Sequence, residues 1–264
     1  MSFLLIFLIF IIDSMWSKIK FILLLVLLII TGVFVYFKIQ VMGDSNSYFN
    51  QHARYKLAKS GFWRWSLGLK NVGDARADFL GNTGPIVIEW FKPVSEDLDD
   101  SVLQDFSKAV QTYTGRSTRL VFGGGVNDST VPLSILNSFQ LKGQIQKPVN
   151  GSILIIYFTK DYLPRQSAEL STTFKENGII ISLDAHKQFL EGYIQNINQY
   201  LGSSLLHEFG HQIGLNHSSD PDCIMSLHAG ISGRPLEFYG RTAPADFCAK
   251  EQAGIQQLKT EYKN

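Results

Sequence analysis

The chain has 264 residues, of which 45% are hydrophobic and 18% are charged, and its formal net charge at pH 7 is +1. This length and apolar content are enough for one sizeable core with an appendage. The small net charge argues against a nucleic-acid partner held by bulk electrostatics, and two cysteines are too few for a small disulfide scaffold.

Two apolar runs dominate the N-terminus. Phe3–Ile12 is too short to span a bilayer alone, whereas Phe21–Phe37 comes close to the hydrocarbon thickness when flanking residues are added. We therefore predict a cytoplasmic or re-entrant apolar segment over residues 1–18 and a transmembrane signal anchor over residues 19–38.

The charges that flank the second run indicate its orientation. Lys18 and Lys20 precede it and Lys38 follows it, a bias that favours a cytoplasmic N-terminus and an exported body. The expected location is the plasma membrane, with a single pass and an extracytoplasmic catalytic domain. Two alternatives are a signal peptide cleaved near residues 41–43 and a synthesis start at Met15.

Residues 39–84 form a polar stretch with scattered aromatic and basic side chains. This composition predicts a juxtamembrane linker, which either lies on the lipid surface or the body as a helix or is a plain connection.

The body is expected to begin at residue 85 and to alternate strands with helices. The predicted strands are residues 85–91, 117–122, 152–159 and 178–183, and a capped amphipathic helix runs from Ser95 to about Gly115. The third strand is the most hydrophobic and should be central. Residues 123–125 read as a glycine turn that closes the second strand, and a long helix should start within residues 189–199. The predicted fold class is α/β (α+β).

The chemistry is concentrated in residues 207–217, whose sequence is HEFGHQIGLNH. His207 and His211 lie four apart on a predicted helix, so both imidazoles can reach one Zn²⁺. Glu208 is placed to act as the general base. Gly214 can take a positive φ, end the helix and let His217 supply a third ligand. A buried helix with incidental histidines is the structural alternative, but it would leave these polar groups unsatisfied.

This motif resembles the metzincin clan of zinc peptidases, and Met225 fits the Met-turn of that clan. Residues 217–225 and 254–258 are similar to the matrixins, the matrix metalloproteinase family (peptidase M10). Archaemetzincins share the spacing from Cys223 to Met225 but need four cysteines, and this chain has Ser218 where the first should stand.

The resemblance implies a zincin-like catalytic domain over residues 85–264, with a twisted mixed sheet packed on two helices and a C-terminal helix. It implies a membrane-anchored zinc metalloendopeptidase that cleaves protein or peptide substrates with one catalytic Zn²⁺ and a zinc-activated water. A substrate strand should add to the sheet edge at residues 178–183. The alternatives are an inactive zincin-fold surface binding module, an archaemetzincin-like peptidase and, less compatible with the polar motif, an intramembrane protease.

Some positions depart from the matrixin pattern. Ser226 stands where an apolar or aromatic residue is usual, and Lys250 with Glu251 stand where the C-terminal helix usually has paired aspartates. These departures put the specificity pocket and the N-terminal ion pair of the family in doubt. His186 is the only histidine of the body upstream of the motif, so we do not expect a second zinc, and His228 is interpreted as a pocket wall or a surface residue.

The two cysteines of the chain are Cys223 and Cys248. No cysteine precedes Cys223 in this sequence, so we do not expect the propeptide of the matrixins that blocks zinc through a cysteine. In an oxidising compartment the pair is expected to form a disulfide that ties the Met-turn to the last helix, the alternative being two buried free thiols.

Overall fold

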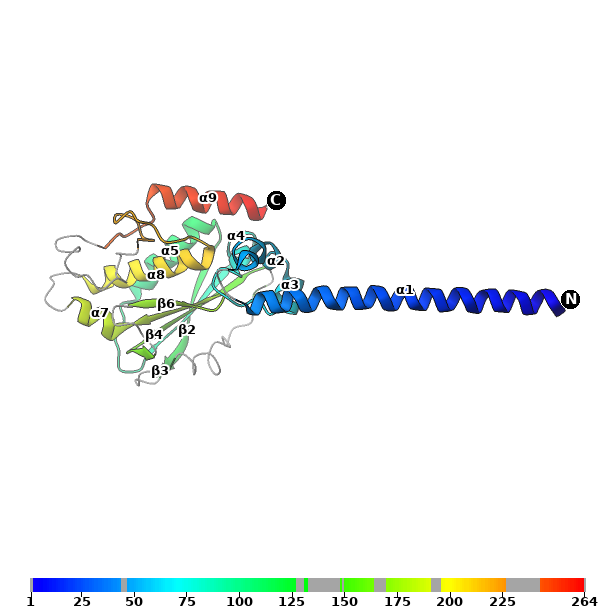
Figure 1. The fold of residues 1–264 in the computed structure, drawn as a ribbon. Coiled ribbons are helices and arrows are strands. Elements are labelled where there is room, and N and C mark those ends of the chain that lie inside the picture. The colour runs from blue at the N-terminus through cyan, green and yellow to red at the C-terminus, as the bar shows by residue number, and fades with distance from the viewer. Residues whose placement is uncertain are drawn as a thin grey trace. The chain divides into compact units, whose positions relative to one another are not determined.

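The computed structural model describes residues 2–43, 47–126, 131–132, 148, 150–163, 170–190, 196–226 and 243–263 (Figure 1). The chain divides into two compact units, Met1–Leu69 and Lys70–Asn264. Residues 70–84, which the sequence assigned to the linker, thus belong to the same unit as the predicted catalytic domain.

The first unit is built on one long helix, α1 (Ser2–Met42), which continues through Asp13 and Ser14 without a break. Lys18–Met42 is long and apolar enough to cross a membrane, although a signal sequence near an N-terminus has the same properties. The short helices of this unit are η1 (Phe49–Ala53), α2 (Arg54–Ala58) and α3 (Gly61–Leu67).

Side chains from these short helices cap the end of α1. The guanidinium of Arg54 donates to Val41 O at 3.3 Å, and Asn50 Nδ2 donates to Gln40 O at 3.2 Å. Carbonyls in the last turn of a helix have no partner inside the helix, so these two bonds supply the missing donors.

The second unit contains a five-stranded sheet in the order β2-β1-β4-β7-β6. The four parallel strands are β1 (Ile86–Pro93), β2 (Thr118–Val126), β4 (Ser152–Thr159) and β7 (Gly178–Ser182), and β6 (Ser171–Phe174) runs antiparallel to β7. Two short strands, β3 (Val131–Pro132) and β5 (Tyr162–Leu163), pair separately. The hydrophobic strand at residues 152–159 is central, as its composition predicts.

The prediction that residues 178–183 form the sheet edge is wrong. β7 pairs with β4 on one side and with β6 on the other, so β6 is the edge strand. β6 escaped prediction because Ser171–Phe174 is only four residues long and mostly polar, which leaves no hydrophobic period to detect.

The prediction of a glycine turn at residues 123–125 is also wrong, because β2 continues through them. The pairing passes from Trp90 opposite Phe122 to Phe91 opposite Gly124, which leaves Gly123 as a bulge. A Cβ on Gly123 would lie 2.3 Å from the ring of Phe91. Glycine is therefore used here for a close approach inside a strand and not for a turn.

Within its described residues the second unit has the helices α4 (Arg76–Leu80), α5 (Asp100–Thr114), α7 (Leu183–Leu190), α8 (Ile197–Ile213) and α9 (Ala249–Lys263). The helix predicted from Ser95 starts later, because Asp99 provides the N-cap by accepting from Ser101 N–H at 2.9 Å. It ends, as predicted, at Gly115, which is left-handed.

Helices α5 and α8 cover the same face of the sheet (Figure 1). Ile86 and Ile88 of β1 alternate onto this face and join the main core cluster. Phe209 of α8 is fully buried there, with its ring edge-on to Phe79 and Phe106. This packing fixes the rotation of α8 about its axis and so determines which way the neighbouring His207 and Glu208 point.

Candidate metal centre

The helix that carries the motif has a defined beginning and end. Asn196 caps its start, and Gly214 follows its last residue with φ +96°. Leu215 N–H donates back to Gly210 O at 2.8 Å, which closes the helix. The positive φ of Gly214 favours glycine, and a Cβ there would also displace the guanidinium of Arg76, which would lie 2.8 Å away. The reversal returns His217 toward the helix.

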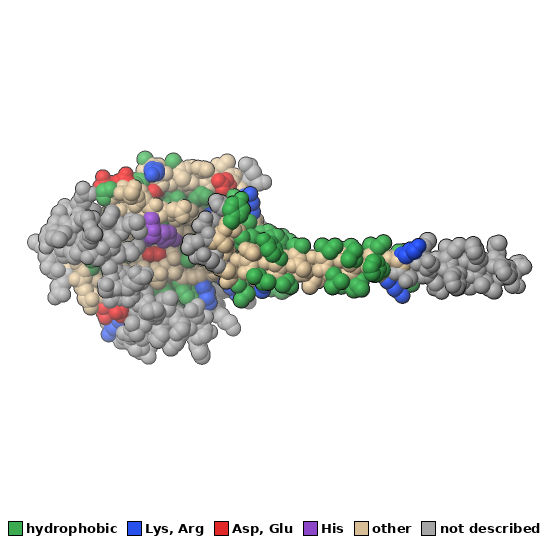
Figure 2. All heavy atoms as spheres, in the orientation of Figure 1, with side chains coloured by type: hydrophobic (Ala, Val, Ile, Leu, Met, Phe, Trp, Pro, Cys, Tyr) green, Lys and Arg blue, Asp and Glu red, His purple; other side chains and the backbone are tan. Residues whose placement is uncertain are grey.

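The three histidines of the motif converge on one point. His207, His211 and His217 each offer a ring nitrogen, and these atoms lie within 4.8 Å of one another. The Nε2 atoms of His211 and His217 are 3.0 Å apart. Histidine side chains reach the surface of this unit in Figure 2, in keeping with an exposed His217 and a half-buried His211.

Backbone carbonyls orient two of the rings. His207 Nδ1 bonds Ile224 O at 2.8 Å, and His211 Nδ1 bonds Leu215 O at 3.1 Å. A carbonyl only accepts, so each Nδ1 carries the proton and each Nε2 keeps its lone pair for a metal.

Burial keeps these rings neutral. It lowers the pKa of His207 and of His211 to about 4, with neighbouring histidines adding to the effect, and it also lowers the pKa of His217. A neutral imidazole is the form that binds metal, so the three histidines can coordinate a metal ion at neutral pH without first losing a proton.

The residues present fit a zinc ion. His207 Nε2 is buried and has no hydrogen-bond partner, a state that is costly unless a metal takes its lone pair. Tetrahedral Zn²⁺ with bonds of about 2.0–2.1 Å to nitrogen places its ligand atoms a little over 3 Å apart, close to the observed approach of two of the rings. Three histidine donors with room for a fourth ligand are typical of a catalytic site.

Glu208 lies beside the histidines and is almost fully buried, with 2% of its surface exposed. Its Oε1 accepts a hydrogen bond from Ser171 Oγ of β6 at 2.7 Å. The structure thus brings the three histidines together and joins Glu208, the residue after His207, to Ser171, which no sequence pattern marks.

Met225 lies under the helix, as expected for a Met-turn, and is fully buried. A Cβ on Gly210 would lie 2.3 Å from Met225 Sδ, so this glycine provides the space that the methionine fills. Ser218 N–H donates to Met225 O at 2.7 Å, and Ser218 forms a bridge with Ser226. The turn is therefore bonded to the chain that follows the third histidine.

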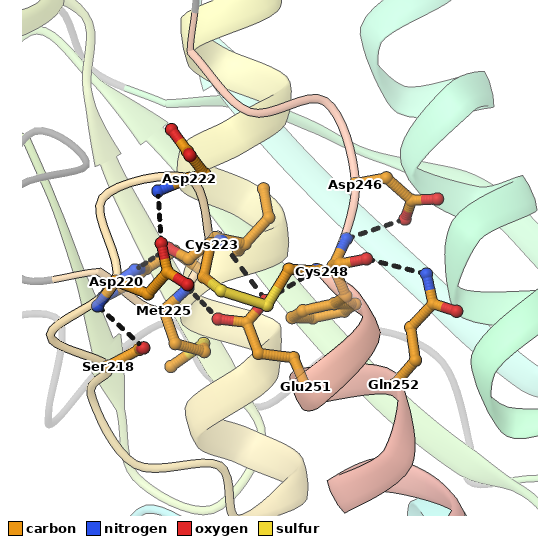
Figure 3. The surroundings of a disulfide bond; sticks show 12 residues. Ser218, Asp220, Asp222, Cys223, Met225, Asp246, Cys248, Glu251 and Gln252 are labelled. Atoms are coloured by element: carbon orange, nitrogen blue, oxygen red, sulfur yellow. Dashed lines mark hydrogen bonds between the residues drawn. A yellow bond between two sulfur atoms is a disulfide. The ribbon is translucent and has the colours of Figure 1, made fainter.

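The carboxylate of Glu251 holds the Met-turn from the other side (Figure 3). It accepts from the backbone N–H groups of Met225 at 2.7 Å, Ile224 at 3.2 Å and Cys248 at 3.0 Å. The departure from paired aspartates noted in the sequence therefore leaves a buried carboxylate that bonds the turn. Beside it, Cys223 and Cys248 form a disulfide with their Cα atoms 5.0 Å apart.

A family model agrees with this geometry. The model of the matrixins, peptidase M10, matches residues 100–235, which is just over half of the chain. The chain belongs to the matrixin family. This matrixin is accordingly a zinc metallopeptidase with the three-histidine cluster of the metzincins.

Solved structures of low sequence identity are similar to this matrixin. They include the archaemetzincin of Methanopyrus kandleri, with 16% identity, TM-score 0.48 and coverage of 68% of this chain and 97% of that one. A zinc-dependent peptidase from Methanocorpusculum labreanum has 17% identity, TM-score 0.47 and coverage of 64% and 99%. The archaemetzincin of Archaeoglobus fulgidus, complexed with malonate, has 11% identity, TM-score 0.40 and coverage of 65% and 99%. No curated protein sequence matches the chain.

The other histidines of this matrixin lie away from the cluster or outside the described residues. His186 is buried in α7, where Nδ1 bonds Ser182 O at 2.7 Å and Nε2 bonds Ser204 Oγ at 2.9 Å. His228, interpreted as a pocket wall or surface residue, lies outside the described residues, as does the side chain of His52.

Proposed function

We propose that this matrixin is a membrane-anchored endopeptidase in which His207, His211 and His217 hold one Zn²⁺ and Glu208 is the general base. The observation that carries the proposal is the buried Nε2 of His207, which has no hydrogen-bond partner among the described residues and lies close to two further imidazoles, with Glu208 next to His207 in α8. When bound, zinc supplies Lewis-acid polarisation of the scissile carbonyl and lowers the pKa of water toward about 7.

The side chains of the protein handle the protons. Glu208 accepts a proton from the attacking water and passes it to the amine nitrogen as the peptide bond breaks. The buried position of Glu208 keeps bulk water from competing for that proton. His207 and His211 stay in one orientation throughout, because Nδ1 of each ring is bonded to the backbone.

The substrate is a peptide that binds as an additional strand on β6. No described strand pairs with the outer side of β6, so an extended peptide can bond to its backbone groups there. Because Ser171 of this strand touches Glu208, a peptide on the edge would pass beside the general base. β6 therefore replaces residues 178–183 as the substrate-binding edge.

The membrane is the second partner in this proposal. The apolar side chains of α1 between Ile19 and Ile39 are mostly exposed, which suits contact with lipid. The disulfide between Cys223 and Cys248 supports an extracytoplasmic catalytic domain, because the cytosol keeps thiols reduced. In this proposal the helix is retained as a single-pass anchor.

The test uses the full-length chain purified in detergent. We expect about one zinc per chain and cleavage of denatured casein that a chelator stops. Glu208→Ala should keep the zinc and lose roughly 100-fold or more of the activity, since general-base catalysis contributes about 10² to 10⁴ in rate. His211→Ala should lose both zinc and activity.

Glu96→Ala is the matched control, because it removes a half-buried carboxylate that pairs with Lys187 outside the site. It should retain zinc and activity. Equal cleavage by the unmodified and Glu208→Ala proteins would reject the mechanism, and zinc without any cleavage in the unmodified protein would point to a binding module.

A further inference from the structure

A buried serine on the edge strand holds the carboxylate of the proposed general base. Ser171 Oγ donates to Glu208 Oε1 at 2.7 Å, and the two residues are only 3% and 2% exposed. A hydrogen bond to an ionised carboxylate is about twice as strong as one between neutral groups. Low exposure means that bulk water does not readily replace the serine hydroxyl.

The backbone on both sides of this bond is fixed. Ser171 pairs with Ile181 in the β6–β7 ladder, and the adjacent Ser182 N–H donates to Leu170 O at 2.9 Å. Side chains alternate along a strand, so this register directs Ser171 toward α8. The ladder therefore fixes the Cα and Cβ of Ser171 opposite α8, which leaves the hydroxyl within reach of Glu208.

The helix is tied to the same hairpin one turn further on. Gln212 Nε2 donates to Gly178 O at 2.8 Å and to Lys175 O at 3.2 Å. Residues four apart lie on one face of a helix, so Glu208 and Gln212 both face the hairpin. Two attachments one turn apart set the distance between Glu208 and β6.

We propose that Ser171 is a positioning residue for peptide hydrolysis, which orients the carboxylate of Glu208 by donating a hydrogen bond to Oε1. This inference rests on the proposed role of Glu208. The terminal torsion of a glutamate has a broad, roughly two-fold preference, so an unrestrained carboxylate would sample several orientations. A misplacement of about 1 Å in a reacting group can cost about 100-fold in rate.

The effect should be confined to the chemical step. Ser171 acts through Glu208 and not on the bound peptide, so its loss should lower kcat and leave KM unchanged. It should not change zinc content, because neither Ser171 nor Glu208 belongs to the histidine cluster. These two features separate positioning from general destabilisation.

The experiment compares Ser171→Ala with the unmodified protein, both full-length and in detergent. The substrate is a fluorogenic peptide copied from a site that the unmodified enzyme cleaves in denatured casein. We expect kcat to fall by about 10- to 100-fold, with KM within about twofold and about one zinc per chain. A crystal structure of the zinc-free variant should show the Glu208 carboxylate moved from its position on Ser171.

Two further variants provide the controls. Ser107→Ala makes the same chemical change at a remote buried serine, whose hydroxyl donates to Thr118 Oγ1 at 2.8 Å. It should share any loss of stability but keep kcat. Ser171→Thr retains the hydroxyl, and threonine suits a strand, so it should recover most of the lost kcat.

The inference is overturned if Ser171→Ala keeps kcat within about twofold, if Ser107→Ala loses as much, or if the loss lies in KM alone. An unmoved Glu208 carboxylate in the zinc-free variant would overturn it too, and this readout does not depend on folding of the threonine variant. The two failures are distinguishable. Full activity of Glu208→Ala rejects the proposed function, whereas an inactive Glu208→Ala with a fully active Ser171→Ala rejects only the role of Ser171.

Discussion

A buried histidine in this protein can be a structural residue or a candidate metal ligand, depending on whether its second ring nitrogen has a hydrogen-bond partner. His186 and His207 are both buried, and burial lowers the pKa of each to about 4. Both ring nitrogens of His186 have protein partners, whereas Nε2 of His207 has none. Burial alone therefore does not identify a metal ligand, but an unsatisfied lone pair beside other imidazoles does.

The first residue-scale prediction concerns His186 and acid. Its pKa in the folded protein is about 4, below the ordinary value of 6.5. Between pH 4 and pH 6.5 the residue is therefore protonated in the unfolded chain and neutral in the folded one. The unfolding free energy should thus fall as pH drops from 6.5 to 4. The contribution of this group has a slope of up to about 1.4 kcal/mol per pH unit.

His186→Asn should remove that contribution and flatten the profile, measured by urea unfolding of chelator-treated protein. Asparagine can still donate to Ser182 O. The motif histidines contribute equally to both proteins, so the difference isolates His186. Parallel profiles for the two proteins would contradict the assignment.

The second residue-scale prediction uses two glycines of α8. Gly210→Ala puts a Cβ 2.3 Å from Met225 Sδ, whereas a Cβ on Gly202 meets nothing within 4 Å. Gly210→Ala should destabilise by roughly 1–3 kcal/mol through overpacking and weaken zinc binding. Gly202→Ala should stabilise by up to about 1 kcal/mol, because alanine favours helix. Thermal unfolding checks both, and equal effects of the two changes would refute the packing argument.

At the scale of elements, α9 supports the metal site from a distance. Glu251 accepts from Ile224 N–H, and Ile224 O in turn accepts from His207 Nδ1. One residue, Ile224, thus links a carboxylate in the last helix to the orientation of a proposed zinc ligand. The adjacent disulfide connects the same turn to the start of α9.

We predict that Glu251→Gln loosens this support. The amide NH₂ cannot accept, so at least one of the three N–H groups now bonded to the carboxylate loses its partner. Hydrogen bonds to charged groups are worth about 1.5–3 kcal/mol, so stability should fall by roughly that amount and zinc affinity should fall with it. Chemical unfolding and chelator competition measure the two quantities.

Lys250→Gln is the matched control, since this neighbouring side chain is exposed. It should change stability by no more than about 0.5 kcal/mol. Unchanged zinc affinity in Glu251→Gln would show that the Met-turn does not transmit the effect of α9 to His207.

At the scale of the whole molecule, the charges and the disulfide bear on the side of the membrane where the catalytic domain lies. Lys18 and Lys20 before the span outnumber Lys38 after it, but Arg54 and Lys56 follow soon after and oppose that bias. The disulfide is the stronger argument, because reducing compartments do not maintain such bonds. The disulfide therefore favours a catalytic domain outside the cytoplasm.

Protease added to intact cells should digest the chain after Lys38. A cytoplasmic protein of the same cells is the control and should stay intact until the membrane is opened. Alkylation without reductant should label neither Cys223 nor Cys248, consistent with the disulfide. Protection of the catalytic domain together with two labelled cysteines would place it in the cytoplasm.

The sequence alone determined the features that depend on short-range spacing. The pattern from His207 to His217 predicted the three-histidine cluster, because helical periodicity and the reversal at Gly214 act within a few residues. The central position of residues 152–159 followed from their uninterrupted hydrophobicity, which only a strand buried on both faces tolerates. The end of α5 at Gly115 was equally local.

Only the tertiary structure decided which distant residues meet. Ser171 lies 37 residues from Glu208, and Glu251 lies 26 residues from Met225, so no periodicity within one element relates the partners. The bulge at Gly123 depends on the register against β1, a choice made between strands. The edge position of β6 likewise depends on which strands pair, because a short polar strand becomes stable only when the sheet beside it has formed.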